Sequence, residues 1–200
     1  GVEQFHDEKS CKAFLDFCRE ITGVPEGQKM VINTWFITHS HRDHYSGFPT
    51  FLSRYSDEFE LKNIMYNFEN NYGSDLHTGS HPFIQKVAQL YPDAKYYNLH
   101  TGEQFNIAGV EVDVLLTMEE RLKYNTPTKG EYISTNFNDT SAVLMMKFDG
   151  KKFLLTGDLG QLDDRLMSMY PSDYIKADIL QVPHHGFDSN HLKLCRTVAP

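Results

Sequence analysis

The 200-residue chain has 40% hydrophobic residues, 27 acidic and 19 basic residues, and a net charge of -8. This length and composition predict a single domain over residues 1–200 with a sizeable core. The acidic balance disfavours a nucleic-acid partner, because binding to a phosphate backbone is driven by counterion release at a basic face. No run of about 18 apolar residues predicts a membrane span, and no signal peptide is recognised. The compartment stays open, with a cytoplasmic location slightly favoured.

The first predicted helix covers residues 10–21, where apolar side chains recur at helical spacing. Ser10 is its candidate N-cap. Cys11 and Cys18 lie on one face of this helix, which favours core packing over a disulfide or a metal site. An apolar run at 30–37 then predicts a buried strand.

A cluster of metal-ligand side chains follows this strand, with His39, His41, Asp43 and His44 inside six residues. Neutral imidazoles and carboxylates are the nitrogen and oxygen ligands that borderline divalent metals prefer. A short loop that carries four of them can surround two ions. His39 and His41 would then point toward one ion, and Asp43 and His44 toward its neighbour.

The remaining pattern predicts an α/β fold with alternating helices and strands. Helices are predicted at 47–55, 80–91, 162–170 and 189–198, and strands at 61–68, 95–99, 104–107, 110–117, 141–148 and 152–156. Asp149-Gly150 predicts a tight hairpin between the last two strands. The stretches 69–79 and 118–137 are predicted to be loops, and long loops in compact domains are often functional.

Two later strands also end in ligand-type residues. The run 152–159 ends in Gly157-Asp158, and the run 177–186 ends in His184-His185. Together with the first cluster, three strands deliver metal ligands at their C-terminal ends. We therefore predict one cleft at one edge of a β-layer.

These motifs resemble the metallo-β-lactamase superfamily, whose signature is His-x-His-x-Asp-His followed by a Gly-Asp and a final His. The closer likeness is to the branch that contains the metallo-hydrolase domain of the bacterial DNA-uptake channel and the choline-phosphate esterases. The segments that carry this likeness are 138–146, 155–158 and 182–186. The resemblance implies an αββα sandwich, which this chain would contain as a fragment, since strands expected before the signature and after the last His are not recognised.

The resemblance also implies two divalent metal ions, which we expect to be zinc, with manganese or iron as alternatives. His39 and His41 would bind the first ion and Asp43 and His44 the second, while Asp158 would bridge the two. One of His184 and His185 would complete the second site. Neighbours on an extended backbone point opposite ways, so these two would rarely serve one metal together. We favour His185 as the ligand and His184 as a catalytic residue that faces the substrate or supports the ligands. Asp43 is the other catalytic candidate, since it can orient a hydroxide or relay its proton.

The chain departs from the family pattern at one ligand. Many members place a third His for the first metal just before the strand that precedes Gly-Asp, and this chain has none there. Asn138 or Asp139 could supply an oxygen ligand instead, or the first metal could be less fully coordinated. The segment could also be an ordinary turn.

The implied chemistry is hydrolysis by a metal-bound hydroxide. A phosphoester or another small molecule is the expected substrate. The alternatives are hydrolysis of a carboxylic ester, thioester or lactone, and a non-catalytic domain that metal only stabilises. Metal stoichiometry separates the last case from the enzymes. The oligomeric state is left open.

Overall fold

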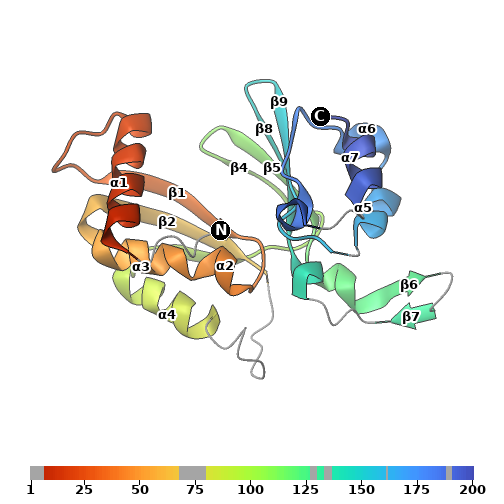
Figure 1. The fold of residues 1–200 in the computed structure, drawn as a ribbon, viewed down its shortest axis with the longest axis horizontal. Coiled ribbons are helices and arrows are strands. Elements are labelled where there is room, and N and C mark those ends of the chain that lie inside the picture. The colour runs from red at the N-terminus through yellow and green to blue at the C-terminus, as the bar shows by residue number, and fades with distance from the viewer. Residues whose placement is uncertain (1–6, 68–79, 127–129, 133–136, 161, 188–190) are drawn as a thin grey trace. The chain divides into compact units, whose positions relative to one another are not determined.

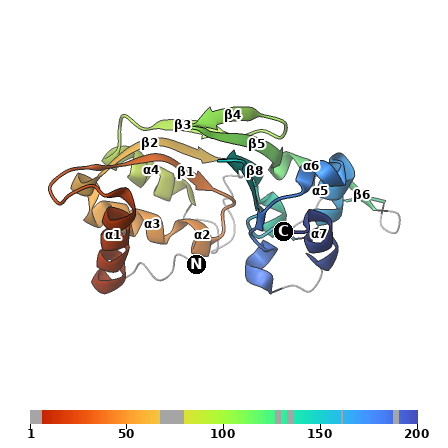
Figure 2. The same cartoon turned by 90° about the horizontal axis from the view of Figure 1, so that it is seen from above.

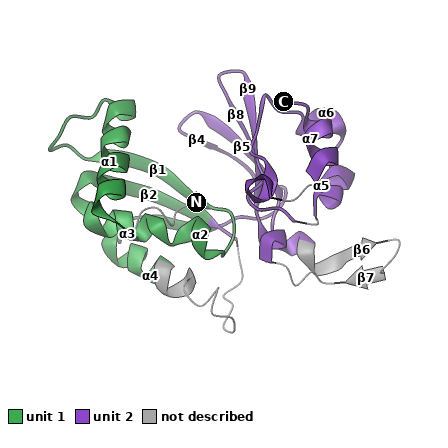
Figure 3. Ribbon diagram, in the orientation of Figure 1, with its two compact units in different colours: residues 1–65, 69–97 green, residues 66–68, 98–200 purple. Residues whose placement is uncertain are grey.

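The computed structural model describes residues 7–67, 80–126, 130–132, 137–160, 162–187 and 191–200 (Figure 1). The chain divides into two compact units (Figure 3). Unit 1 comprises Gly1–Met65 and Glu69–Tyr97, and unit 2 comprises Tyr66–Phe68 and Asn98–Pro200. No helix in the described residues is long and apolar enough to cross a membrane. The prediction of one domain over residues 1–200 stays a prediction.

Unit 1 is built on a three-stranded sheet of order β1-β2-β3. Its strands are β1 (Met30–Ile37), β2 (Phe59–Tyr66) and β3 (Lys95–Asn98), and its helices are α1 (Glu8–Thr22), α2 (Arg42–Tyr45), α3 (Gly47–Arg54) and α4 (Ser80–Leu90). Helices α1 and α3 lie along one face of the sheet (Figure 2). The fully buried Phe51 of α3 joins these layers, with its ring centroid 4.9 Å from Phe14 of α1 and 5.3 Å from Phe59 of β2.

The predicted N-cap of α1 is wrong by one turn. Asp7 caps the helix, because its carboxylate accepts the Ser10 backbone N–H at 2.7 Å. A carboxylate three residues ahead of that N–H satisfies one of the donors that the first turn leaves open. None of Cys11, Cys18 and Cys195 forms a disulfide, and Cys11 is buried, as core packing predicts. Burial raises the pKa of the Cys11 and Cys18 thiols.

Unit 2 is built on a five-stranded sheet of order β10-β9-β8-β5-β4. Its strands are β4 (Gln104–Ile107), β5 (Val110–Leu116), β8 (Val143–Phe148), β9 (Lys151–Leu155) and β10 (Ile179–Leu180), and its helices are α5 (Asp163–Met169), α6 (Ser172–Ile175) and α7 (Leu192–Val198). Strands β9 and β10 run parallel, and the other neighbours are antiparallel. The helices gather on one side of the sheet (Figure 1), where Leu166 and Leu194 pack against Leu154 and Met145 of the strands.

The α/β fold class and the hairpin are confirmed. Strands β8 and β9 pair in register from Leu144↔Leu155 to Phe148↔Lys151. Asp149 and Gly150 both have positive φ, at 49° and 72°. A two-residue hairpin turn whose twist matches the strands requires this conformation at both positions.

Two element predictions fail in part. The stretch 118–137 is not a continuous loop, since it contains the 3-10 segment η3 (Met118–Lys123) and a small ladder of β6 (Tyr124–Thr126) with β7 (Gly130–Tyr132). These strands are too short for periodicity to reveal them. The strand predicted at 177–186 shrinks to β10, because the backbone turns into the 3-10 segment η5 (Pro183–Gly186). The predicted loop at 69–79 lies outside the described residues.

Candidate metal centre

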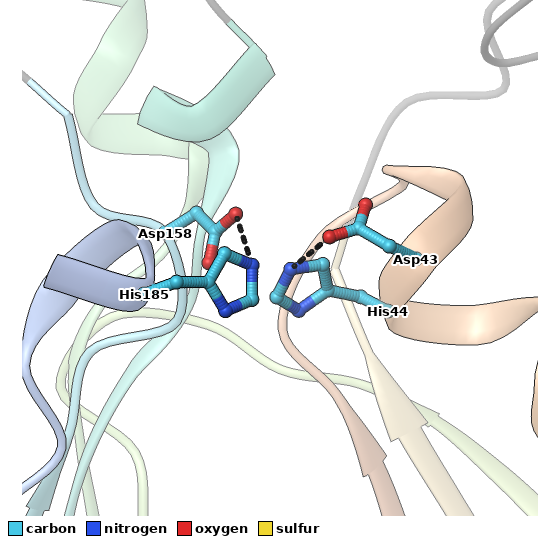
Figure 4. Close-up of side chains that lie close together, drawn as sticks. All are labelled: Asp43, His44, Asp158 and His185. Atoms are coloured by element: carbon cyan, nitrogen blue, oxygen red, sulfur yellow. Dashed lines mark ion pairs between the residues drawn. The ribbon is translucent and has the colours of Figure 1, made fainter. Parts of the chain in front are cut away.

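The ligand loop of unit 1 begins where β1 ends at Ile37. Helix α2 then makes a single turn, in which the His44 N–H donates to the His41 carbonyl at 3.0 Å. This turn draws four ligand-type side chains together. His39 Nε2 lies 2.9 Å from His41 Nδ1, and the His39 and His44 ring centroids are 4.2 Å apart. His44 Nε2 lies 3.3 Å from Asp43 Oδ2 (Figure 4).

The orientation of the His39 ring is set by the residue before it. Thr38 Oγ1 lies 3.0 Å from His39 Nδ1, and the His39 side chain is fully buried. A ligand histidine commonly bonds an oxygen through one ring nitrogen while the other faces the metal. Here Nδ1 contacts the threonine hydroxyl and Nε2 faces His41, which is the arrangement that a shared cation requires.

Unit 2 brings its two ligand candidates together through neighbouring strands. Asp158 follows β9 and His185 follows β10, and parallel strands deliver their C-terminal ends to the same edge of a sheet. Asp158 Oδ2 lies 3.5 Å from His185 Nε2 (Figure 4). Asp158 is buried, and its backbone N–H donates to Ser141 Oγ at 3.0 Å.

The reason given for separating His184 from His185 is wrong, because the backbone there is not extended. His184 (φ 48°, ψ 48°) and His185 (φ 54°, ψ 14°) are both left-handed, and Gly186 continues with φ 78°. Two successive non-glycine residues in this region are strained. The side chains still have different neighbours, since His184 Nε2 lies 3.4 Å from Asn138 Nδ2 while His185 lies beside Asp158. The roles assigned to the two histidines stay predictions.

Asn138 and Asp139 lie in a buried 3-10 turn, η4 (Phe137–Thr140), with 6% and 0% of their surface exposed. The segment is therefore a turn, which was one of the alternatives predicted for it. Its position beside His184 keeps Asn138 close to the predicted ligands. Whether Asn138 or Asp139 replaces the third His stays a prediction.

The donor chemistry in each unit fits a divalent metal ion. Unit 1 offers three imidazoles and a carboxylate, and unit 2 offers a buried carboxylate beside an imidazole. Nitrogen and oxygen donors of this type suit zinc, manganese and iron alike, so they do not select one metal.

Histidines outside these motifs have other surroundings. His100 is exposed and pairs with Glu119, and this hydrogen bond raises the pKa of its imidazole. It is a surface histidine with its own partner. His77 and the side chain of His81 lie outside the described residues.

Sequence reasoning missed the residues that hold the ligand loops, namely Thr38, Ser141 and Gln181. Thr38 adjoins the ligand cluster, and Ser141 lies within the recognised segment 138–146, where it was given no role. Gln181 interrupts the otherwise apolar run Ile179-Leu180-Gln181-Val182 at the end of β10. A polar side chain at the end of a strand that precedes predicted ligands could have indicated a residue that supports them.

A sequence profile of the β-lactamase superfamily domain matches residues 22–199. The chain belongs to the metallo-β-lactamase superfamily. The match covers all the motifs from His39 to Gly186 and confirms the resemblance at the level of the superfamily. Kinship with the DNA-uptake and choline-phosphate branch stays a prediction. No curated protein matches this member of the superfamily.

Solved structures similar to this superfamily member include the diiron β-hydroxylase CmlA from Streptomyces venezuelae (12% identity, TM-score 0.43, 80% of this chain and 26% of that chain). Zinc-bound PqqB from Methylobacterium extorquens is another (15% identity, TM-score 0.47, 82% of this chain and 52% of that chain). The short form of human tRNase Z is a third (17% identity, TM-score 0.41, 82% of this chain and 62% of that chain). The chain thus spans between 26% and 62% of the length of these proteins.

Proposed function

We propose that this chain is a hydrolase that depends on two divalent metal ions and acts on a phosphoester bond. One observation carries the proposal. In each unit, ligand-type side chains that follow a strand lie in contact, with 2.9 Å between His39 Nε2 and His41 Nδ1 and 3.5 Å between Asp158 Oδ2 and His185 Nε2. Membership of the superfamily supports reading each of these sets as metal ligands.

In this proposal each ligand keeps the assignment that the motifs imply. The first ion takes His39 and His41, and the second takes Asp43, His44 and His185. Asp158 would contribute to both ions, as the resemblance implies, and its burial fits a carboxylate whose charge is balanced by cations. Zinc is the first choice, with manganese and iron as alternatives.

The ions, when bound, supply a Lewis acid that lowers the pKa of water and polarises the oxygen of the scissile bond. The chain's own residues orient the reactants. Asp43 is half-buried beside His44, where we assign its carboxylate to orient a hydroxide or relay its proton. His184 is half-buried beside Asn138 rather than beside Asp158, so we assign it to the substrate.

The phosphoester class rests on the finer resemblance to the DNA-uptake and choline-phosphate branch. The net charge of -8 favours a small phosphoester over a long nucleic-acid duplex. A carboxylic ester, thioester or lactone would need the same ligands, so only turnover distinguishes these substrates.

The test is metal content per chain, measured with turnover of bis-p-nitrophenyl phosphate and p-nitrophenyl acetate after loading with zinc or manganese. We expect two ions per chain and turnover of the phosphodiester. Asp158→Ala should lower kcat/KM by more than about 100-fold, because residues that only support a metal ligand already account for about 10–100-fold. Asp164→Ala is the matched control, since Asp164 is exposed and pairs with Lys193 at 2.7 Å in the same unit.

Other results would assign a different function. Turnover of the acetate alone would favour the carboxylic ester class. One ion or none, with neither substrate turned over, would contradict the hydrolase and favour a domain that metal only stabilises.

A further inference from the structure

The side chain of Gln181 lies between the two ligand loops of unit 2. Its Oε1 accepts the backbone N–H of Thr156 at 2.9 Å and that of Gly157 at 2.8 Å. Its Nε2 donates to the carbonyl of Gly157 and to that of Val182, both at 2.9 Å. One amide thus holds the turn before Asp158 and the segment before His184-His185.

This pattern uses the full capacity of a primary amide. An amide oxygen accepts two hydrogen bonds and its nitrogen donates two, and all four are made here to backbone groups. A carboxylate of the same shape would place an oxygen against two carbonyls, and an aliphatic side chain would leave the backbone groups unsatisfied. The donor and acceptor atoms of the Gln181 side chain therefore match the backbone groups around it, and its length lets it reach them.

The strand ladder does not reach the ligands. Strand β10 pairs with β9 only at Ile179↔Phe153 and Leu180↔Leu154. Beyond these pairs the chain turns into the left-handed run His184-His185-Gly186, and the His184 N–H makes only a long 3.3 Å bond to the Gly157 carbonyl. The bonds of Gln181 fall in the gap between the last ladder pair and the ligands.

A second contact at the same level reinforces the link. Thr156 Oγ1 donates to the Gln181 backbone carbonyl at 2.7 Å, and the Gln181 N–H donates to the Leu154 carbonyl at 2.9 Å. Beyond the last ladder pair, the side chain and backbone of Gln181 therefore connect the chain after β10 to the chain after β9 through hydrogen bonds. These contacts lead on one side to Asp158 and on the other to His185, whose side chains lie 3.5 Å apart.

We propose that Gln181 is a positioning residue of the metal centre, whose amide locks the Asp158 loop to the His184-His185 loop. The proposal rests on the proposed function, because it takes Asp158 and His185 as ligands. Removal of the amide should allow the distance between Asp158 and His185 to vary. It should therefore lower metal affinity more than it lowers the thermal stability of the metal-free protein.

The experiment measures zinc affinity by competition with a chromophoric chelator, and the visible spectrum of the cobalt(II)-loaded protein, which reports ligand geometry. Wild type is compared with Gln181→Leu, Gln181→Glu and Tyr170→Phe. Tyr170→Phe is the control, because it removes one hydrogen bond in the same unit, 2.8 Å to the Leu115 carbonyl, without touching a ligand loop. Thermal unfolding of each metal-free protein records stability separately.

We expect Gln181→Leu to weaken binding of one zinc ion by about 10–100-fold and to change the cobalt spectrum. Gln181→Glu keeps one acceptor oxygen and should fall between Gln181→Leu and wild type. If Gln181→Leu does not fold, Gln181→Glu carries the test. Tyr170→Phe should lower thermal stability while leaving zinc affinity and the cobalt spectrum at the wild-type values.

Failure of the positioning role and failure of the proposed function would give different results. If Gln181 variants lose thermal stability but keep wild-type zinc affinity and cobalt spectrum, Gln181 is structural and the positioning role is overturned, while the proposed function stands. If the wild-type protein binds neither zinc nor cobalt(II), and loading with manganese or iron also gives no bound ion, the proposed function fails and the positioning role fails with it.

Discussion

The two ligand-bearing regions differ in how their residues are brought together. In unit 1, His39, His41, Asp43 and His44 come from one continuous loop that a single helical turn shapes. In unit 2, Asp158 and His185 follow different strands and meet only because β9 and β10 are parallel neighbours. The first set is local in sequence, and the second depends on tertiary structure.

This difference predicts where each region is sensitive to substitution. The unit 1 loop is held by its own backbone and by Thr38, the residue next to it. The unit 2 loops are held by Ser141 and Gln181, which are distant in sequence from Asp158. Unit 2 should therefore lose metal binding through residues that are not ligands more readily than unit 1 does.

The largest losses of zinc affinity should come from substitution of the predicted ligands, and these losses should be similar in the two regions. His41→Ala in unit 1 and His185→Ala in unit 2 should each lower zinc affinity by more than about 100-fold, for the reason given for Asp158. Zinc competition on the purified variants measures this. Ser53→Ala is the control, since Ser53 is exposed on α3 and bonds only to the Thr50 carbonyl. A wild-type affinity in either histidine variant would remove that residue from the ligand set.

An intermediate effect should separate the two regions. Gly186 (φ 78°) ends the left-handed run of unit 2, whereas no residue from 38 to 46 in unit 1 has a positive φ. Gly186→Ala should destabilise the fold by about 1 kcal/mol, because a side chain disfavours this conformation. It should also weaken zinc binding by about 10-fold, since it shifts the backbone that carries His185.

Gly150→Ala is the matched control for Gly186→Ala. Gly150 has a similar φ of 72° and open space where a Cβ would lie, but it sits in the β8–β9 turn. Chemical denaturation should give the two variants a similar loss of stability, and zinc competition should distinguish them. If both bind zinc like wild type, the left-handed run does not set the ligand geometry.

The same contrast explains what the sequence could predict. The hairpin at Asp149-Gly150, the strand at 30–37 and the cluster at 39–44 are local patterns, and each was predicted. The burial predicted for that strand is wrong for most of its length, since only Met30 and Ile37 are buried. The contacts of Gln181 could not be predicted, although its polar side chain was a signal, because Thr156 and Gly157 follow the neighbouring strand β9 and lie 25 and 24 residues away. The left-handed His184-His185 pair was also missed, since residue preference predicts an extended or helical backbone for histidine. Superfamily resemblance supplied the ligand set that periodicity alone could not.

The smallest effect should come from the other end of β10. Asp178 precedes this strand, and its carboxylate accepts the Lys152 N–H at 2.9 Å and the Lys151 ammonium at 3.0 Å. The bond from the Lys152 N–H, with that from Lys151, holds the Asp178 pKa below its ordinary value of 3.8. A carboxylate with a lowered pKa in the folded state stabilises the fold above its unfolded pKa, and this contribution is lost as the pH falls through the folded pKa.

Asp178→Asn should therefore lower the melting temperature of the metal-free protein slightly at pH 7, and the difference should disappear on acidification below the folded pKa of Asp178. Zinc affinity should stay within about twofold of wild type, because surface substitutions away from a site change free energies by about 0.5 kcal/mol or less. Melting curves across pH, with zinc competition at pH 7, measure both. A loss of zinc affinity as large as that expected for Gln181→Leu would mean that the whole of β10, rather than the amide at its end, positions His185.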